Sequence, residues 1–302
     1  MEYGAGYGDP ALVLVVLSRC WGYRWNLLGR GPLRRRYQIP RHSAPAQLLD
    51  AALGPGEDFE ANVRFLQPIK PPSDLALSIR VALMGRSPIQ ALRASPTTTC
   101  RLADGSVIAV NQLLKVPTDT TVSSRYCKGG GMEINGFSYE GPLSFVRLND
   151  VWLAVNEVRL ENYVASVVGA EMPRHWHAEA LKAQAVAARS YAVTHLVRPA
   201  GQTYHLGDTT RWQVFSGPSS VSEQSKRAAH ETNGMVLSYR GGLVESLYAS
   251  TQTISEEAHR HLGASMSQHG AQRLATQGLR FDEILGRYYQ GATLAQLRRD
   301  GS

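Results

Sequence analysis

The stretch from Glu161 to Leu196 constrains this chain most, because it combines a strong helix pattern with an isolated acid. Its second half carries apolar residues at steps of three and four, which places them on one face of a helix. These residues are Ala178, Leu181, Ala185, Ala188, Ala192 and Leu196. The pattern predicts a long amphipathic helix, with Lys182, Gln184 and Arg189 off the apolar stripe.

Glu171 precedes this helix and stands among apolar and aromatic residues, namely Val167, Val168, Met172, Pro173 and Trp176. Pro173 suits a helix entrance, because a first-turn residue needs no backbone N–H, and Glu179 would complement the helix dipole. Apolar surroundings disfavour a charged carboxylate and raise its pKa, as a general acid requires. The sequence therefore predicts a carboxylic acid at a helix entrance, which is either catalytic or a buried, hydrogen-bonded structural residue.

The same stretch resembles the signature of a known family. It reads E-x-Y-V-x-x-V-V-x-x-E-M-P and then E-A-L-K-A-Q-A-V-A-A-R-S-Y-A. This pattern is similar to that of the stage II sporulation protein D family, also called the amidase-enhancer family. The resemblance is close over Val158 to Tyr191 and continues, with gaps, from about Leu77 to Gly291. Characterised members are lytic transglycosylases of peptidoglycan, so the resemblance implies that activity, with Glu171 at the position of the family's catalytic acid.

The resemblance also implies a set of substrate-binding residues. The helix motif, the D-T-x-x-x-Q-x-[YF]-x-G loop and the late segments supply Lys182, Gln184, Arg189, Tyr191, Asp208, Gln213, Ser250 and Gln268. Lys182 and Arg189 could hold acetamido or carboxylate groups of the glycan. Alternatively, these two cations pair with Glu179 or Asp208.

One departure from the family concerns zinc. Some relatives place a zinc-binding cysteine just before the loop glutamine, where this chain has Trp212 with Arg211 beside it. Because thiolate is the soft ligand that such a site needs, we expect no structural zinc and no other cofactor. We interpret His205 as a hydrogen-bonded loop histidine rather than a ligand.

Further departures follow the predicted late hairpin. The family's pair of glycines is replaced by Gln252 and Thr253, and only Ile254 to Leu262 separates them from the closing motif. In that motif, Gly263 to Ala271, the family's histidine falls at Leu262. His259 and His261 have the spacing of one strand face and could bind a metal, but no third ligand is evident, so we expect two surface histidines.

The remaining pattern predicts an α+β fold with a β-rich N-terminal part, the central helix, a late β-hairpin and C-terminal helices. Strand alternation begins at Leu77 to Leu83 and continues around 106–110 and 120–124, while Asn135-Gly136 and Asn149-Asp150 signal hairpins. We expect residues 1–74 to be a basic, proline-rich leader and linker, 77–291 one sporulation protein D-like domain, and 292–302 a tail.

Composition and charge limit the compartment and the partners. The net charge of +7 suits an anionic polymer such as cell wall, whereas no nucleic-acid motif is present. No stretch approaches the roughly 20 apolar residues that span a bilayer. Ala11 to Leu17 is short and follows acidic residues, so it makes no convincing signal peptide. The family nevertheless implies the cell envelope, periplasmic or extracellular, as the location. Cys100 and Cys127 could form a disulfide or remain free thiols.

Three functions remain open at this stage. The first is a peptidoglycan lytic transglycosylase with Glu171 as acid and base, favoured by the intact central motif. The second is a non-catalytic wall-binding protein that enhances a separate N-acetylmuramoyl-L-alanine amidase, favoured by the altered closing motif. The third is a degenerate relative kept for an interaction role, favoured by the weak export signal.

Overall fold

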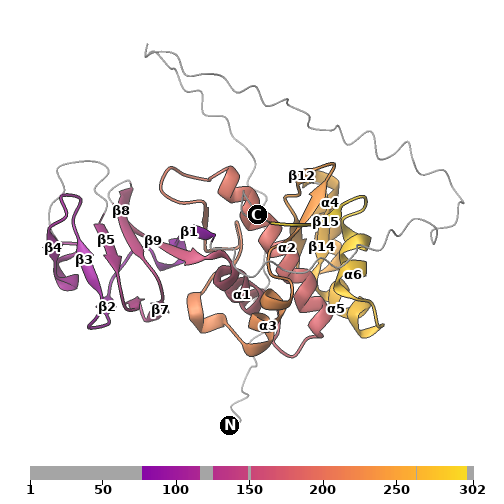
Figure 1. The fold of residues 1–302 in the computed structure, drawn as a ribbon, viewed down its shortest axis with the longest axis horizontal. Helices are drawn as coiled ribbons and strands as arrows, with labels where there is room; N and C mark the ends of the chain where they lie inside the picture. The colour runs from indigo at the N-terminus through magenta and orange to yellow at the C-terminus, as the bar shows by residue number, and fades with distance from the viewer. Residues whose placement is uncertain (1–76, 116–124, 149–150, 263, 298–302) are drawn as a thin grey trace, which may run out of the picture. The chain divides into compact units, whose positions relative to one another are not determined.

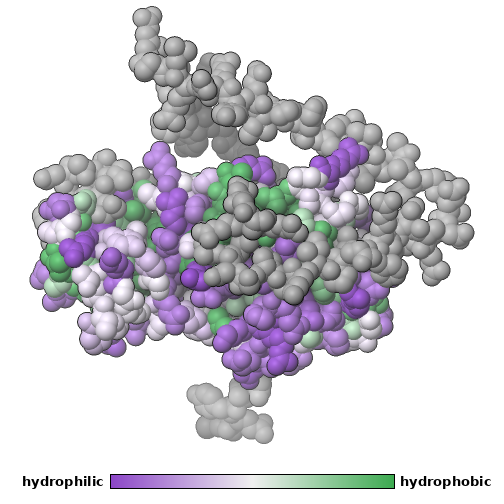
Figure 2. All heavy atoms as spheres, in the orientation of Figure 1, coloured by the Kyte–Doolittle hydropathy of each residue, from purple (hydrophilic) through white to green (hydrophobic). Residues whose placement is uncertain are grey.

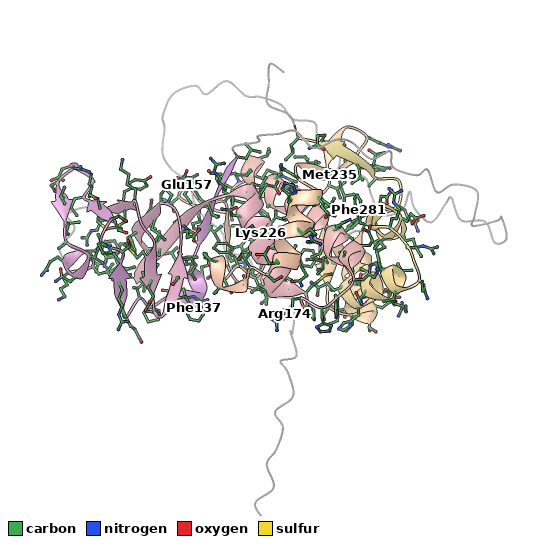
Figure 3. The ribbon with its side chains drawn as sticks, turned by 60° about the horizontal axis from the view of Figure 1, so that its bottom comes forward. Phe137, Glu157, Arg174, Lys226, Met235 and Phe281 are labelled. Carbon is green, nitrogen blue, oxygen red and sulfur yellow. A yellow bond between two sulfur atoms is a disulfide. The ribbon has the colours of Figure 1, made fainter. Side chains whose placement is uncertain are left out.

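The computed structural model describes residues 77–115, 125–148, 151–262 and 264–297, apart from the side chains of 258–262. The chain divides into two units, 1–62 and 63–302, and every described residue lies in the second. This unit is α+β, as predicted, with β2 to β9 gathered at one end and the helices at the other, where β12, β14 and β15 lie among them (Figure 1). Figure 3 shows Phe137 among the strands and Phe281 among the helices.

A seven-stranded sheet forms the β-rich part, in the order β10-β1-β9-β8-β5-β3-β4. Neighbouring strands are antiparallel except for β10, which lies parallel to β1. The strands are β1 (Ser78–Ala82), β3 (Thr99–Arg101), β4 (Val107–Ile108), β5 (Arg125–Lys128), β8 (Leu143–Leu148), β9 (Val151–Arg159) and β10 (Leu206–Gly207). In β1 the predicted alternation is confirmed only in part: Ile79 and Val81 are fully buried and Ser78 is exposed, but Ala82 is also fully buried and Leu77 is exposed.

The predicted Asn135-Gly136 hairpin is also confirmed. It joins β6 (Met132–Ile134) to β7 (Phe137–Tyr139), and β2 (Leu92–Ala94) completes a three-stranded sheet. Both turn residues have positive φ, 49° and 85°, as a two-residue type I′ turn requires. Strands β8 and β9 pair as predicted, whereas their turn at 149–150 and the predicted strand at 120–124 lie outside the described residues.

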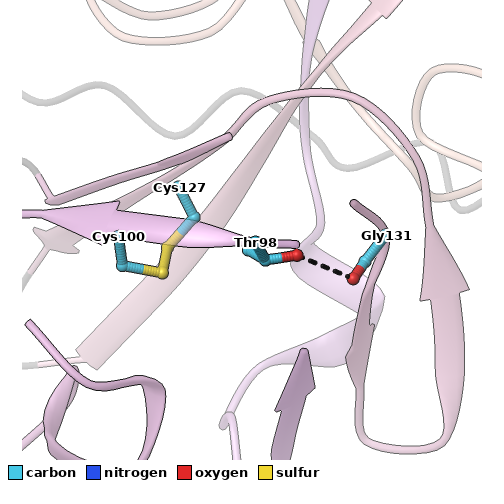
Figure 4. The surroundings of a disulfide bond; sticks show 4 residues. All are labelled: Thr98, Cys100, Cys127 and Gly131. Carbon is cyan, nitrogen blue, oxygen red and sulfur yellow. Dashed lines mark hydrogen bonds between the residues drawn. A yellow bond between two sulfur atoms is a disulfide. The ribbon is translucent and has the colours of Figure 1, made fainter. Parts of the chain in front are cut away.

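Cys100 and Cys127 form a disulfide, so one of the two states left open by the sequence is observed (Figure 4). The two residues are direct partners across β3 and β5, with their Cα atoms 4.0 Å apart. Beside the bridge, the Thr98 hydroxyl donates a hydrogen bond to the backbone oxygen of Gly131 at 3.2 Å. The bridge therefore links two neighbouring strands, β3 and β5, near one edge of the large sheet.

The helices of the described residues are α1 (Leu160–Glu171), α2 (Ala178–Val197), α3 (Glu223–Glu231), α4 (Gln252–Leu262), α5 (Gln268–Thr276) and α6 (Phe281–Tyr288), with 3₁₀ turns η2 (Met84–Arg86), η3 (Val110–Gln112) and η4 (Gly217–Ser220). Helix α2 lies where it was predicted and packs against α1, α3, α5 and α6. Its burial is not confined to one stripe, since Gln184 and Arg189 are fully buried. The reason is that other elements cover α2 on several sides, which makes it the core of the helical part.

The late strands are β11 (Met235–Tyr239), β12 (Gly242–Leu243), β13 (Leu247–Ala249), β14 (Ser265–Ser267) and β15 (Thr293–Gln296). The predicted hairpin is shorter than expected, because β11 pairs with β12 over two residues only and the chain after Leu243 no longer pairs with β11 in this ladder. The Ser246 hydroxyl donates to the backbone oxygen of Ala187, which holds this segment against α2. Strand β13 instead runs parallel to β14, and β15, in the segment expected to be a tail, pairs with β11.

The segment with the replaced glycine pair is helical, because Gln252 and Thr253 begin α4. The prediction that His259 and His261 have the spacing of one strand face is therefore wrong, since both residues belong to this helix. In the part of the chain that the structure describes, no helix is both long and apolar enough to cross a membrane. On the face shown in Figure 2, hydrophilic residues cover the lower part of the helical end, and apolar patches appear among the strands.

Candidate active site

Glu171 is the last residue of α1, so the prediction that it lies at a helix entrance is wrong. Met172 adopts an extended conformation, with φ −126° and ψ 140°, because the following Pro173 disfavours a helical residue before it. Helix α2 begins only at Ala178, capped by the His177 side chain, which accepts a hydrogen bond from the backbone N–H of Glu179. A helix C-terminus disfavours negative charge, so the corrected position still favours a protonated Glu171.

Two donors hold the Glu171 carboxyl group. The backbone N–H of Val214 donates to Oε1 at 2.9 Å, and the side-chain amide of Gln268 donates to Oε2 at 3.4 Å. Burial raises the pKa of Glu171, and the two hydrogen bonds offset only part of this effect. The residue as a whole is not fully buried. Glu171 therefore combines a fixed orientation, a raised pKa and incomplete burial.

The loop after β10 supplies the wall beside Glu171. Gln213 is fully buried, accepts a hydrogen bond from the Tyr163 hydroxyl at 2.9 Å and donates to the backbone oxygen of Ala188 at 3.3 Å. Phe215 stacks on the Tyr163 ring with centroids 5.3 Å apart. Because the side chains on both sides of Val214 are anchored inward, its N–H stays aimed at Glu171. Gln213 thus belongs to the site, through its packing.

The parallel strands β13 and β14 bring two further predicted residues to this place. Gln268 follows β14 directly and bonds Glu171, while Ser250 follows β13 and accepts, through its backbone oxygen, a hydrogen bond from His269 N at 3.1 Å. Beyond Glu171, the rings of Trp176 and His269 meet edge to face with centroids 4.8 Å apart. The loop between α1 and α2 is thereby fastened to α5; Figure 3 labels Arg174 in this loop.

Arg189 occupies the core instead of a binding surface. Its Nε and Nη2 donate to the Glu161 carboxylate at 2.8 and 2.6 Å, and its other contacts include the backbone oxygens of Ala229 and Met235. The side chain has no exposed surface. This geometry matches the ion-pair alternative, with Glu161 as the partner in place of the acids that the sequence suggested.

Lys182 is also paired. Its Nζ lies 2.8 Å from Glu179 and 2.7 Å from Glu231, and Glu179 additionally accepts the backbone N–H of Phe281 at the start of α6. Burial lowers the pKa of Lys182, but the two carboxylates outweigh it and the net pKa is raised. Lys182 thus connects α2 to α3, which is the structural alternative stated above.

The other predicted residues lie in distinct surroundings. Tyr191 packs on His195 with ring centroids 4.6 Å apart, and burial raises its pKa. Asp208 is buried and accepts the backbone N–H of Gly85 at 2.9 Å, and burial raises its pKa. Gln184 is fully buried, and its amide has no hydrogen-bond partner within the described part of the chain. The described hydrogen bonds of Glu171 go to Val214 and Gln268 and to none of these three residues.

Among the described residues between 77 and 297, no three His, Cys, Asp or Glu side chains lie close enough together to hold a metal ion. Trp212, at the family's cysteine position, is partly buried against the core, with the Arg211 guanidinium 4.9 Å from its ring. His205 accepts a hydrogen bond from the backbone N–H of Arg80 at 2.9 Å, so its interpretation as a hydrogen-bonded histidine is confirmed.

An open groove of about 440 Å³ lies on the β2-β6-β7 sheet, away from these residues in the fold. Its lining includes Arg93, Ser95, Glu133, Tyr139 and Pro218, and none of the predicted site residues takes part. We place the candidate site at Glu171 because the chemistry, rather than the size of a depression, identifies it.

Sequence reasoning missed two tyrosines near Glu171. Tyr163 stands two helical turns before Glu171 on α1, and Tyr248 lies in the middle of β13. Each lies close enough for the Glu171 charge to raise its pKa further, after burial. The helical spacing of Tyr163 could have revealed it, whereas the position of Tyr248 depends on the parallel pairing of β13 with β14.

Comparison with known proteins finds sequence relatives of the segment that carries Glu171. Residues 149–239 match the family model described as Stage II sporulation protein, SpoIID, and this range contains α1, α2 and the loop with Val214. An uncharacterized protein of Brachyspira hyodysenteriae is 36% identical over 121 residues, which is 40% of this chain and 33% of that protein.

Two named relatives also match. The amidase enhancer of Bacillus subtilis is 41% identical over 99 residues, covering 33% of this chain and 13% of the relative. The stage II sporulation protein D of Bacillus amyloliquefaciens is 32% identical over 113 residues, covering 32% of this chain and 33% of the relative. The chain thus matches about a third or less of each relative's length. The segment 149–239, which carries Glu171, is therefore a stretch that matches the stage II sporulation protein D family.

Proposed function

We propose that this protein remodels peptidoglycan as a lytic transglycosylase, with Glu171 as its single acid and base. The observation that carries the proposal is the buried Glu171 carboxyl group, held by Val214 N–H and the Gln268 amide, with a raised pKa. A general acid must hold its proton at the working pH, and a raised carboxyl pKa provides that.

The reaction needs one proton to move out and back. Protonated Glu171 gives its proton to the glycosidic oxygen as the bond from that oxygen to the muramyl C1 breaks. The C6 hydroxyl of the same muramyl residue then attacks C1, and its proton passes to the Glu171 carboxylate. The products are a free hydroxyl on the leaving sugar and a 1,6-anhydromuramyl end, and no water is consumed.

The neighbouring acids support a mechanism with one carboxylate. Hydrolytic glycosidases normally use two carboxyl groups on opposite sides of the scissile bond. Here Glu161 is committed to Arg189, and Glu179 to Lys182 and the N–H of Phe281. Neither is available as a second catalytic carboxylate, so an internal hydroxyl is the better nucleophile for this site.

The compartment fits the same proposal. The Cys100–Cys127 disulfide is typical of proteins in an oxidising environment outside the cytoplasm. The net charge of +7 suits an anionic wall polymer. Both observations favour a location in the cell envelope, where peptidoglycan lies.

A second function is a non-catalytic, wall-binding enhancer of a separate N-acetylmuramoyl-L-alanine amidase. The observation in its favour is helix α4. This helix begins at Gln252 and Thr253, which replace the family's glycine pair, and it packs against β14. A site in which α4 replaces the family's glycine-containing segment could bind glycan without cleaving it. The name of the Bacillus subtilis relative, amidase enhancer, is consistent with this alternative.

Glycan strands stripped of stem peptides separate the two functions. We would incubate them with the wild type, Glu171→Gln and Glu179→Gln, and identify the products by mass. The enzyme proposal predicts anhydromuramyl ends from the wild type and Glu179→Gln, and none from Glu171→Gln. Glycan binding by all three proteins without any product would instead favour the enhancer.

A further inference from the structure

Tyr248, in the Glu171 site, has a buried hydroxyl that donates no hydrogen bond to any described residue. The residue lies in the centre of β13 and is the register partner of Met266 in β14. Gln268, which bonds Glu171, stands just beyond the end of β14. The parallel pairing therefore carries Tyr248 and Gln268 to the same place.

Two other tyrosines with buried hydroxyl groups, Tyr163 and Tyr289, donate a hydrogen bond within the protein. The Tyr163 hydroxyl donates to Oε1 of Gln213 at 2.9 Å, and the Tyr289 hydroxyl donates to the backbone oxygen of Leu247 at 2.6 Å. Buried hydroxyl groups are nearly always paired in this way, because losing water without gaining a partner is destabilising. Tyr248 is thus an exception that stands next to the candidate acid.

The surroundings of Tyr248 leave its hydroxyl free to donate. The Gln213 amide acts on Tyr248 as a donor and lowers its pKa, whereas the Gln213 oxygen already accepts from Tyr163, so the hydrogen of the Tyr248 hydroxyl is left for another acceptor. Burial raises the pKa of Tyr248 well above its usual value, and the charge of Glu171 raises it further. The hydroxyl therefore stays protonated at any working pH and serves as a neutral donor.

Tyr248 as a whole residue is partly exposed, although its hydroxyl oxygen is buried. Glu171 is itself partly accessible, so a ligand that reaches the carboxyl group can also meet this hydroxyl.

We propose that Tyr248 contacts the substrate, donating a hydrogen bond from its hydroxyl to an oxygen of the N-acetylated sugar bound at Glu171. This inference rests on the proposal that the Glu171 site binds glycan, and it does not require that the glycan be cleaved. The hydroxyl, glycosidic and acetamido oxygens of such a sugar are all acceptors for a neutral donor.

Binding in an inactive background tests the inference. The protein is the full chain with Glu171→Gln, and the probe is a stem-peptide-free oligosaccharide of alternating N-acetylglucosamine and N-acetylmuramic acid. We would compare this background with the additional changes Tyr248→Phe and Tyr289→Phe, using calorimetry for affinity and thermal unfolding for stability. Tyr289→Phe is the matched control, because it removes a buried hydroxyl that already has a protein partner.

The two variants are expected to separate affinity from stability. Tyr248→Phe should weaken glycan binding about 3- to 10-fold, the worth of one hydrogen bond, and leave the melting temperature unchanged or higher. Tyr289→Phe should lower the melting temperature and keep the affinity within about twofold.

Three results would overturn the assignment of Tyr248. They are an unchanged affinity in Tyr248→Phe, a loss of stability as large as that of Tyr289→Phe, or no glycan binding by the Glu171→Gln background. Because the measurement involves no cleavage, the predicted pattern together with an inactive wild type would uphold Tyr248 and reject only the lytic reaction.

Discussion

Gln268 and Glu171 lie 97 residues apart in the sequence and meet in the structure, where the Gln268 amide donates to Oε2 of Glu171 at 3.4 Å. The contact joins the closing motif of the chain to the end of α1. Although the segment before β14 is shorter than in the family, Gln268 still reaches Glu171.

The first prediction concerns this hydrogen bond. The Gln268 amide stabilises the charged form of Glu171 and lowers its pKa against the effect of burial. Gln268→Leu should therefore raise the pKa of Glu171 and move the alkaline limit of glycan cleavage to higher pH. A pH profile of product formation measures this shift. Gln272→Leu is the control, because Gln272 lies on the same helix and bonds the backbone of His177. A shift to lower pH would contradict the assignment.

The second prediction concerns stability and pH. Burial raises the pKa of Glu171 in the folded state, so its contribution to stability is fully present below the unfolded pKa. That contribution is lost as pH rises through the folded pKa. Glu171→Gln should consequently be more stable than the wild type at neutral pH and equal to it in acid.

Urea titrations across the acid range measure the difference, with Glu179→Gln as a control of opposite sign. Burial raises the pKa of Glu179, but hydrogen bonds from Lys182 and Phe281 lower it overall. Glu179→Gln should therefore lose stability relative to the wild type as pH rises through the range in which Glu179 ionises. Parallel behaviour of the two variants would count against the raised pKa of Glu171.

The third prediction separates structure from binding at Arg189. Replacing Arg189 with Met leaves Glu161 without its buried partner and should lower the free energy of unfolding by about 3–5 kcal/mol. Lys182→Met, which breaks more accessible pairs, should cost about 1 kcal/mol. Chemical denaturation compares the two. A cost below that of Lys182→Met, together with weakened glycan binding, would restore Arg189 as a substrate-binding residue.

The fourth prediction concerns the disulfide. Reduction of Cys100–Cys127, which are 27 residues apart, should lower the free energy of unfolding by about 2–4 kcal/mol. Thermal unfolding with and without a thiol reductant measures the effect. The double variant Cys100→Ala, Cys127→Ala should unfold at the lower temperature in both conditions. An equal response of wild type and double variant to the reductant would exclude this bridge as the cause.

Local patterns predicted the elements that depend on neighbours in the sequence. The period of three and four residues located α2, and Asn135-Gly136 located the β6–β7 turn, because both signals act within a few residues. The loop motif predicted Gln213 as a substrate-binding residue, which stays a prediction; in the structure Gln213 bonds Tyr163 and lies next to Val214, whose N–H bonds Glu171.

Contacts between distant segments could not be predicted in this way. The pairing of β13 with β14, which places Tyr248 near Glu171, depends on how β13 packs against α2 and α4, and β14 against α4, α5 and α6. The burial of Arg189 depends on its meeting Glu161 across two helices, and a stripe pattern assigns such a residue to the surface. The end of α1 at Glu171 depends on the extended conformation of Met172. The family motif runs continuously over both helices and gives no sign of this end.

Digestion of stripped glycan strands in heavy-oxygen water tests the central account most directly. If Glu171 acts alone and the muramyl C6 hydroxyl is the nucleophile, the wild type will yield anhydromuramyl ends that contain no heavy oxygen, and Glu171→Gln will yield none. Reducing ends that carry one heavy oxygen, or equal yields from both proteins, would contradict a transglycosylase that depends on Glu171.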